Sequence, residues 1–447
     1  MLTNCQINNF QLTRQIGSGA YGLVFHAVDV ITENEYAVKA VMKNQAASTS
    51  ASAANNDIKK SAVLQTQLYH YFKSFENRLF LPSINLDSIR GLGEEQLMRS
   101  PHFREIAMHL RVHSHPNVVT VHQVLESPLA TFLVMDYYPR DLFTSIVDDQ
   151  HFAHDGQLIK KVFLQLCSVL KHCHDRGVYH CDIKPENILL DGDDNAFLCD
   201  FGLSTLSTHL PANVCVGSSY YMAPERISCP TSLTSTEDNQ GFPSASGDVW
   251  SLGIILINLT CIRNPWLKAH QLEDNTFHYF VKDPKVLMKI LPVSQDLYQL
   301  LADILRLDPY SRISLESLME RVSACTRFTS SGPLSQVEAL TEEQVHEFII
   351  GNRGMEMKKM LYDYHSEDEE EAEDVEDDTE YSSEEESYRQ LSSVDTTPNG
   401  SVDVDHVHVG VKQPKRILPD DFKSRYLQLN LSTVTNYSSQ GRWLPQY

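Results

Sequence analysis

The stretch that decides the fold is Tyr179–Leu190, with the sequence YHCDIKPENILL. Its first part holds four polar side chains close together: His180, Asp182, Lys184 and Asn187. The apolar run Ile188–Leu190 follows at once and is typical of a short buried strand. A polar turn in front of a strand would explain this composition without any chemistry. A loop that gathers a carboxylate, a cation and an amide around one reacting group explains the spacing better, and the rest of the chain supports this interpretation.

The stretch resembles the catalytic loop of eukaryotic protein kinases, whose usual form is H-R-D-x-K-x-x-N. The resemblance implies that Asp182 accepts the proton of a substrate hydroxyl and that Lys184 lies over the γ-phosphate of ATP. It also implies that Asn187 holds Mg²⁺, with Mn²⁺ as an alternative metal. Lys184 is typical of the serine/threonine branch of the family. One position departs from the pattern, because Cys181 stands where most members have arginine.

A second motif, IGSGAYGLV at Ile16–Val24, contains the glycine pattern G-x-G-x-x-G. This pattern also occurs in dinucleotide-binding folds, where a helix follows the glycines directly. Here residues 23–28 favour a strand and lead through a turn to a second strand at 36–41, which carries Lys39. The order predicts a glycine flap whose backbone amides approach phosphate oxygens. By resemblance, Lys39 is the lysine that pairs with the α- and β-phosphates.

The resemblance extends to the other residues around the nucleotide. Asp200, in Asp200-Phe201-Gly202, matches the aspartate that holds the metal together with Asn187. Met135 would border the adenine pocket, and Asp136 and Tyr138 would belong to the hinge between the lobes. The set that the resemblance places at the nucleotide is Ile16, Gly17, Ser18, Gly19, Ala20, Tyr21, Gly22, Val24, Ala37, Lys39, Met135, Asp136, Tyr138 and Leu189.

Lys39 needs a glutamate partner from a helix, and Glu105 is expected to supply it, although 66 residues separate the two. The intervening segment 46–100 is an insertion, and its residues 58–80 show near-helical apolar spacing. We expect it either to pack on the small lobe as a surface insertion or to act as a regulatory or docking element beside the Lys39–Glu105 pair. His109 is expected to be a core histidine.

The second half of the chain supplies further landmarks. The apolar spacing in 157–176 predicts a buried helix. Asp141 is expected to cap the helix that follows it, or to meet the ribose or a basic substrate residue. By resemblance, Glu225 pairs with Arg312, and Asp248 hydrogen-bonds the backbone of the catalytic loop. Residues 227–246 are expected to form a loop insertion.

Residues 203–222 resemble an activation segment, closed by Ala223-Pro224-Glu225. Its candidate phosphate acceptors are Ser204, Thr205, Ser207, Thr208, Ser218 and Ser219. In many kinases the arginine of the catalytic loop pairs with a phosphate on this segment and orders it. Cysteine cannot form such a pair, so Cys181 predicts an activity that does not depend strongly on phosphorylation here.

Composition limits the other possibilities. The formal charge of −22 is uneven, because residues 363–405 hold 18 acidic residues and one basic residue. The acidity therefore belongs to a tail and argues against nucleic-acid binding. Nine scattered cysteines predict reduced thiols in a cytoplasmic or nuclear protein. The N-terminus shows no secretory pattern, and the longest apolar run, 252–262, is too short to span a bilayer.

Together these motifs predict an α+β, bilobal protein kinase fold over 10–325, with the large lobe at 137–325. The tail, 326–447, is expected to be largely disordered, with a helix at 342–362. The motifs predict a monomeric serine/threonine kinase that uses Mg-ATP on protein substrates, and they resemble those of fungal Ran-type kinases of nutrient and meiosis signalling. A pseudokinase scaffold that acts through 46–100 and the tail is the alternative. A small-molecule kinase is disfavoured by Ala223-Pro224-Glu225 and Lys184.

Overall fold

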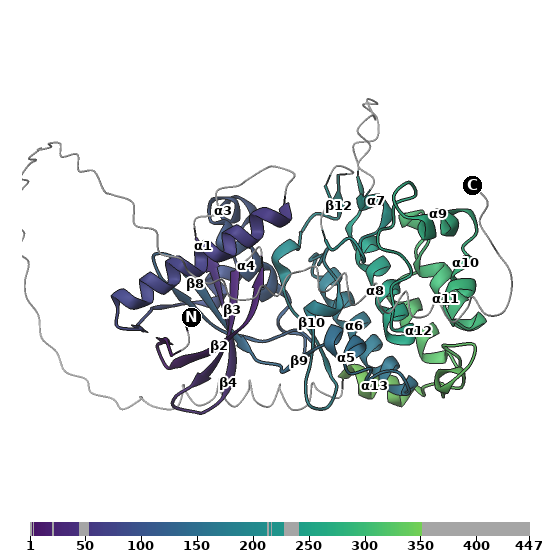
Figure 1. Ribbon diagram of the computed structural model, residues 1–447, viewed down its shortest axis with the longest axis horizontal. Helices are drawn as coiled ribbons and strands as arrows, with labels where there is room; N and C mark the ends of the chain where they lie inside the picture. The colour runs from purple at the N-terminus through teal and green to yellow at the C-terminus, as the bar shows by residue number, and fades with distance from the viewer. Residues whose placement is uncertain are drawn as a thin grey trace, which may run out of the picture. The chain divides into compact units, whose positions relative to one another are not determined.

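The computed structural model describes residues 2, 4–19, 22–43, 53–211, 214–215, 217–227 and 241–350. These residues form a small lobe built on a β-sheet and a larger helical lobe, as Figure 1 shows. The predicted bilobal α+β architecture is therefore confirmed. Residues 46–52 and 228–240 of the two predicted insertions lie outside the described residues. So do the acidic tail and Ala20 and Tyr21 of the glycine motif.

The small lobe contains an eight-stranded sheet in the order β5-β1-β2-β3-β4-β8-β7-β6. Its strands are β1 (Gln6–Ile7), β2 (Phe10–Gly19), β3 (Gly22–Asp29), β4 (Glu35–Met42), β5 (Arg78–Leu79), β6 (Ser83–Ile84), β7 (Val121–Glu126) and β8 (Ala130–Asp136). Its helices are α1 (Ala53–Ser74), α2 (Leu86–Arg90), α3 (Glu94–Arg99), η1 (Pro101–Phe103) and α4 (Arg104–Val112).

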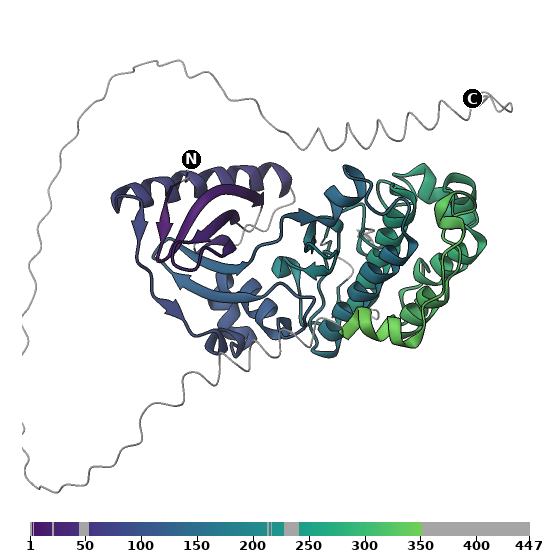
Figure 2. The same cartoon turned by 90° about the horizontal axis from the view of Figure 1, so that it is seen from below.

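Alternation along the strands gives this sheet two apolar faces. On β8, Phe132 and Val134 belong to one buried cluster, together with Leu68 and Phe72 of α1. Leu133 and Met135 of the same strand, which point the other way, belong to the cluster that contains α4. In Figure 2, α1 runs along one side of the sheet. The sheet therefore lies between α1 and α4, and Lys39 of β4 is paired with Leu133 of β8.

The predicted helix in the insertion is confirmed, but its bounds differ. Helix α1 ends at Ser74, because Glu76 and Asn77 adopt positive φ angles of 54° and 64° and turn the chain out of the helix. Leu64, Leu68 and Phe72 are buried. Phe80, which the periodicity places in the helix, is 82% exposed. The insertion thus packs on the small lobe through one face of α1.

The large lobe is built around two long buried helices, α6 (Gly156–Asp175) and α8 (Ser244–Cys261). Helix α8 is long and apolar enough to cross a membrane by composition, but most of it is buried inside this lobe. The remaining elements are β9 (Arg140–Asp141), α5 (Leu142–Val147), η2 (Pro185–Asn187), β10 (Ile188–Leu190), β11 (Ala196–Leu198), η3 (Phe201–Leu203), β12 (His209–Leu210), α7 (Pro224–Ile227), β13 (Phe242–Pro243), α9 (Asn275–Lys282), α10 (Val286–Ile290), α11 (Gln295–Ile304), η4 (Pro309–Ser311), α12 (Leu315–Ala324), η5 (Pro333–Ser335) and α13 (Glu342–Ile350).

The predicted boundaries at 10 and 325 are too narrow for the packed unit. Before residue 10, Ile7 of β1 is fully buried and pairs with Phe10 of β2. After residue 325, Phe328 is fully buried. The buried Lys160 of α6 donates to the carbonyls of Ser323 and Glu338, at 2.9 and 2.6 Å. Of the predicted helix at 342–362, the structure describes α13, and the remaining residues lie outside the described part.

The other boundary that differs is that of the insertion at 227–246. Ser244 begins α8, and Phe242–Pro243 forms β13, which pairs with β12 of the activation segment. The end of this segment is thus part of the folded lobe. Single apolar residues in a stretch rich in serine and proline have no periodicity from which the pairing could be predicted.

We predict that Phe72→Ala lowers the free energy of unfolding by about 3–5 kcal/mol, the range for truncating a fully buried phenylalanine. Phe72 is 1% exposed and meets the ring of Phe132 edge-on, with 6.5 Å between the centroids. Urea unfolding followed by circular dichroism measures the change. Phe75→Ala is the matched control, since Phe75 is 52% exposed and its truncation should cost less than about 1 kcal/mol. Equal losses for the two variants would contradict the packing of α1 described here.

Candidate active site

The centre of the site is the ammonium group of Lys39, which lies between two carboxylates. It contacts Oε1 of Glu105, on α4, and Oδ1 of Asp200, at 3.0 Å. The predicted Lys39–Glu105 pair is thus formed across the 46–100 insertion. Burial alone would lower the pKa of Lys39, but the charges of Asp200 and Glu105 outweigh it and hold the pKa above its ordinary value.

Asp200 is turned toward this lysine by an unusual backbone conformation. Its φ and ψ angles are 63° and 73°, in the left-handed region that few non-glycine residues occupy. Burial would raise the pKa of its carboxyl group, but the charge and hydrogen bond of Lys39 lower the pKa to about 2. The carboxylate is therefore ionised at neutral pH.

The catalytic loop presents Asp182 with donors on both carboxylate oxygens. Lys184 Nζ donates to Oδ2 at 2.6 Å. The backbone amide and the hydroxyl of Ser218 donate to Oδ1 at 2.8 and 3.0 Å. These contacts fix the orientation of the carboxylate and link it to the activation segment, about 36 residues further along the chain.

Asn187 lies within the same loop, on η2. Its amide nitrogen donates to the backbone carbonyl of Asp182 at 2.9 Å, which leaves its amide oxygen as the atom able to bind a metal. Asn187 and Asp200 therefore offer one amide oxygen and one carboxylate. Such oxygen donors suit Mg²⁺, which is usually held by one or two carboxylates with the remaining positions taken by substrate phosphates and water.

The buried Asp248 of α8 holds the backbone of the loop, as predicted. Its carboxylate accepts from the amides of His180 and Cys181, at 3.0 and 2.8 Å, and lies 2.8 Å from Nε2 of His174. Burial would raise the pKa of Asp248, but these hydrogen bonds and the nearby histidines keep it below its ordinary value. Cys181 has a φ angle of 63°, which is strained for a residue other than glycine. The hydrogen bonds to Asp248 hold the loop in this conformation.

Several residues predicted to hold the nucleotide lie on neighbouring strands of the small-lobe sheet. Ala37 of β4 pairs in register with Met135 of β8, and Gly19 pairs with Gly22 at the tip of the β2–β3 hairpin. A side chain at Gly22 is excluded, since a Cβ atom there would lie 2.1 Å from the carbonyl oxygen of Ala40. The ring of Tyr138 stacks on Phe197, whose strand β11 pairs with Leu189 of β10.

Other predicted side chains have structural partners. Asp141 caps α5 by accepting from the amide of Thr144 at 2.7 Å. Glu225 and Arg312 form a two-pronged ion pair at 2.6 and 2.7 Å. His109 is a core histidine, as predicted: its Nε2 lies 2.7 Å from the carbonyl oxygen of Val119, and burial lowers its pKa to about 3. Asp136 accepts from His122 at 2.6 Å.

The activation segment is held by contacts within the chain rather than through Cys181. Arg226 donates to the carbonyls of Leu210 and Phe242, at 3.0 and 2.7 Å, and so joins β12 to β13. The amide of Ser244 donates to the carbonyl of Thr208 at 2.9 Å. Burial raises the pKa of the Cys181 thiol, which favours the predicted inert thiol over a reactive one. The pKa of Cys199 is likewise raised to about 12 by burial and by the charge of Asp200.

Two functional features escaped prediction from the sequence. Ser218 is on the list of phosphate acceptors, yet its hydroxyl is engaged with Asp182. Gly217, before it, has a φ angle of 106°, and a Cβ atom there would lie 2.7 Å from the carbonyl oxygen of Cys181. A glycine directly before Ser218 is the sequence feature that could have indicated this contact, because only glycine fits so close to the carbonyl of Cys181. Of the other candidates, Ser204 and Thr205 are buried, whereas Ser207, Thr208 and Ser219 are exposed.

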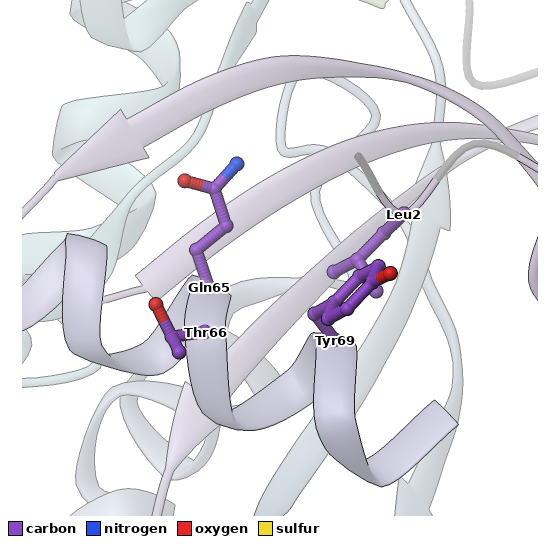
Figure 3. Close-up of a pocket in the computed structure, with 4 residues that line it drawn as sticks. All are labelled: Leu2, Gln65, Thr66 and Tyr69. Atoms are coloured by element: carbon purple, nitrogen blue, oxygen red, sulfur yellow. The ribbon is translucent and has the colours of Figure 1, made fainter. Parts of the chain in front are cut away.

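A separate hollow of about 350 Å³ lies on the α1 side of the small lobe. Figure 3 shows its lining, which consists of Leu2, Gln65, Thr66 and Tyr69. Helix α1 covers the face of the sheet opposite α4, so this hollow is not part of the site around Lys39.

The chain is similar to known proteins over most of its length. The model of the protein kinase domain matches residues 88–322. Serine/threonine-protein kinase SKS1 of Saccharomyces cerevisiae is 60% identical over 364 residues, covering 79% of this chain and 72% of that protein. Serine/threonine-protein kinase VHS1 of the same yeast is 53% identical over 372 residues, covering 81% of each chain.

A more distant relative is named "Negative regulator of sexual conjugation and meiosis" and comes from Schizosaccharomyces pombe. It is 37% identical over 328 residues, which cover 70% of this chain and 59% of that protein. Members of the family use ATP as the phosphate donor. With these matches and the geometry around Lys39 and Asp182, the chain belongs to the protein kinase family and is a serine/threonine protein kinase of the fungal type.

Proposed function

We propose that Asp182, Lys184, Lys39 and Glu105 are the catalytic residues of this kinase and that Asn187 and Asp200 hold Mg²⁺. The observation that carries the proposal is the position of Lys39 between Glu105 and Asp200, while Asp182 is held by Lys184 and Ser218. A scaffold without activity has no chemical need for these ionised groups in this arrangement. The alternative of a pseudokinase is therefore disfavoured.

When bound, Mg-ATP supplies the phosphoryl group to be transferred and a metal that neutralises its charge. Asp182 orients the serine or threonine hydroxyl of the protein substrate and accepts its proton. Lys184 adds positive charge next to this carboxylate, and Lys39 holds phosphate oxygens on the other side. Because all these groups are fixed before the reaction, catalysis rests on positioning and on stabilisation of the developing charge.

The activation segment of this kinase is proposed to be ordered without phosphate. Support comes from the β12–β13 pair, from the two carbonyls that Arg226 binds and from the mutual backbone hydrogen bonds of Tyr179 and Thr205, both 2.9 Å long. The contact of Ser218 with Asp182 is part of the same arrangement. Cysteine at position 181 is compatible with it, since no phosphate has to be bound there.

The broader role is proposed from the relatives. The name of the Schizosaccharomyces pombe protein supports a role in signalling that controls growth or meiosis. The reduced thiols of the described residues support a cytoplasmic or nuclear location. A docking partner on 46–100 and a monomeric state remain predictions. Val63, Phe75, Phe80 and Met98 are among the exposed apolar side chains that such a partner would meet.

We predict that Asp182→Asn abolishes transfer of the γ-phosphate from Mg-ATP to a degenerate serine/threonine peptide library. The amide keeps the shape of the side chain but cannot accept the proton. Binding of Mg-ATP, measured by calorimetry, should persist in this variant. Asp193→Asn is the control for an exposed aspartate outside the site. Wild-type binding of Mg-ATP without any transfer would instead favour the scaffold.

We also predict that Ser218→Ala lowers kcat by about 10- to 100-fold, the effect of losing a hydrogen bond to a charged group. Ser218→Thr, which keeps the hydroxyl, should retain most of the activity. Ser219→Ala is the matched control, because Ser219 is the exposed neighbour. A similar loss in both alanine variants would show that the contact with Asp182 is not what matters.

Finally, treatment with a phosphatase should leave the activity unchanged within about twofold, because the segment is ordered by protein contacts. The double variant Ser207→Ala, Thr208→Ala removes the two exposed hydroxyls before β12 and should behave in the same way. Mass spectrometry of the treated enzyme confirms that phosphate has been removed. A large loss of activity that maps to this segment would refute the prediction.

A further inference from the structure

The insertion between Lys39 and Glu105 does more than cover one face of the small lobe. After α1, β5 pairs with β1 at one edge of the sheet, with Arg78 opposite Gln6 and Leu79 opposite Ile7. The chain then reaches the other edge, where β6 pairs with β7. Both edges of the sheet are thus occupied by strands from the insertion.

Beyond β6, the insertion packs against α4, the helix that carries Glu105. Ile89 of α2 and Leu97 of α3 are buried in the same apolar cluster as Ile106 and Leu110 of α4. The guanidinium of Arg111, on α4, donates to the carbonyl of Leu92, between α2 and α3, at 2.9 Å. The short helix η1 leads directly into α4 at Arg104. The insertion therefore contacts α4 through η1 at its start, and through α2 and the carbonyl of Leu92 further along.

The other side of α4 faces the catalytic machinery. The ring of His109 lies 4.9 Å from that of Phe201, the residue after Asp200. Arg104 donates to the carbonyl of Ser204 in the activation segment at 3.3 Å. Helix α4 is therefore packed between the insertion and the segment that holds Asp200, and Glu105 reaches Lys39 from this position.

We propose that α2, α3 and η1 form a built-in activating element that holds α4 where the Lys39–Glu105 pair forms. Ile89, on α2, and Arg111, on α4, are the positioning residues at this contact, and they act through Glu105 rather than on the substrate. Residues 105–110 and 112 of α4 are buried by this chain's own residues. The kinase therefore adopts its active arrangement without a partner on α4. This inference rests on the proposed role of the Lys39–Glu105 pair.

The test measures kcat and KM for ATP in the full chain. Ile89→Ala and Arg111→Ala should each lower kcat/KM for ATP by about tenfold or more, because Lys39 loses its partner. The matched control for Ile89→Ala is Leu68→Ala, a truncation at a fully buried residue of α1, on the other face of the sheet. The control for Arg111→Ala is Arg99→Ala, whose side chain is 81% exposed on α3.

A double-mutant cycle separates positioning from general loss of stability. In the background of Glu105→Gln, Ile89→Ala should have little further effect on kcat/KM, since both changes act on the same pair. All assays are run below the melting temperatures of the variants, as measured by circular dichroism. If Ile89→Ala does not fold, Arg111→Ala decides.

Equal losses of activity in Ile89→Ala and Leu68→Ala, or full additivity with Glu105→Gln, would overturn the inference. Full activity of Arg111→Ala and Ile89→Ala would overturn it as well. Lys39→Met identifies failure of the underlying proposal: if this variant keeps wild-type activity, the role of the pair is wrong. Inactivity of Lys39→Met together with unchanged Ile89→Ala rejects the activating element alone.

Discussion

The structure depends first on the burial of one cation, Lys39. An ammonium group removed from water is costly unless opposite charges and hydrogen bonds compensate for it. Here one carboxylate comes from α4 and the other from the turn after β11. Three segments, distant in sequence, must therefore meet for the charge to be satisfied. Removing either carboxylate would leave a buried charge with a single partner, so the arrangement is formed as a unit.

A second buried charge organises the large lobe in a similar way. Asp248 is 1% exposed, and its oxygens accept from two backbone amides of the catalytic loop. Because α8 is a buried apolar helix, the loop is fixed to the core of the large lobe. The carboxylate of Asp182 is then oriented by Lys184 and Ser218 rather than by solvent. Asp248 thus fixes the backbone of the catalytic loop, and Lys184 and Ser218 fix the carboxylate of Asp182.

Much of the fold and of the site could be predicted from the sequence, because the chemistry lies in short motifs. Asp182, Asn187 and Asp200 have fixed spacings. Lys39 is predicted from the strand that follows the glycine motif, and Glu105 from the helix that precedes His115-Pro116-Asn117. The two-residue strands β5 and β6 could not be predicted, since two residues show no periodicity. The same holds for the packing of 326–350, which relies on isolated side chains such as Phe328. The role of Ser218 depends on tertiary contact with Asp182, which no local pattern contains.

The placement of β5 and β6 has a consequence for the solution behaviour of the small lobe. An open strand at the edge of a sheet offers unpaired amides and carbonyls to any passing chain, and short edge strands are one way in which proteins avoid such pairing. Here the longer strands β2 and β7 are interior, and the outermost strands are only two residues long. The insertion therefore places a strand of only two residues at each end of the sheet, which lowers the tendency of the small lobe to pair edge to edge with another chain.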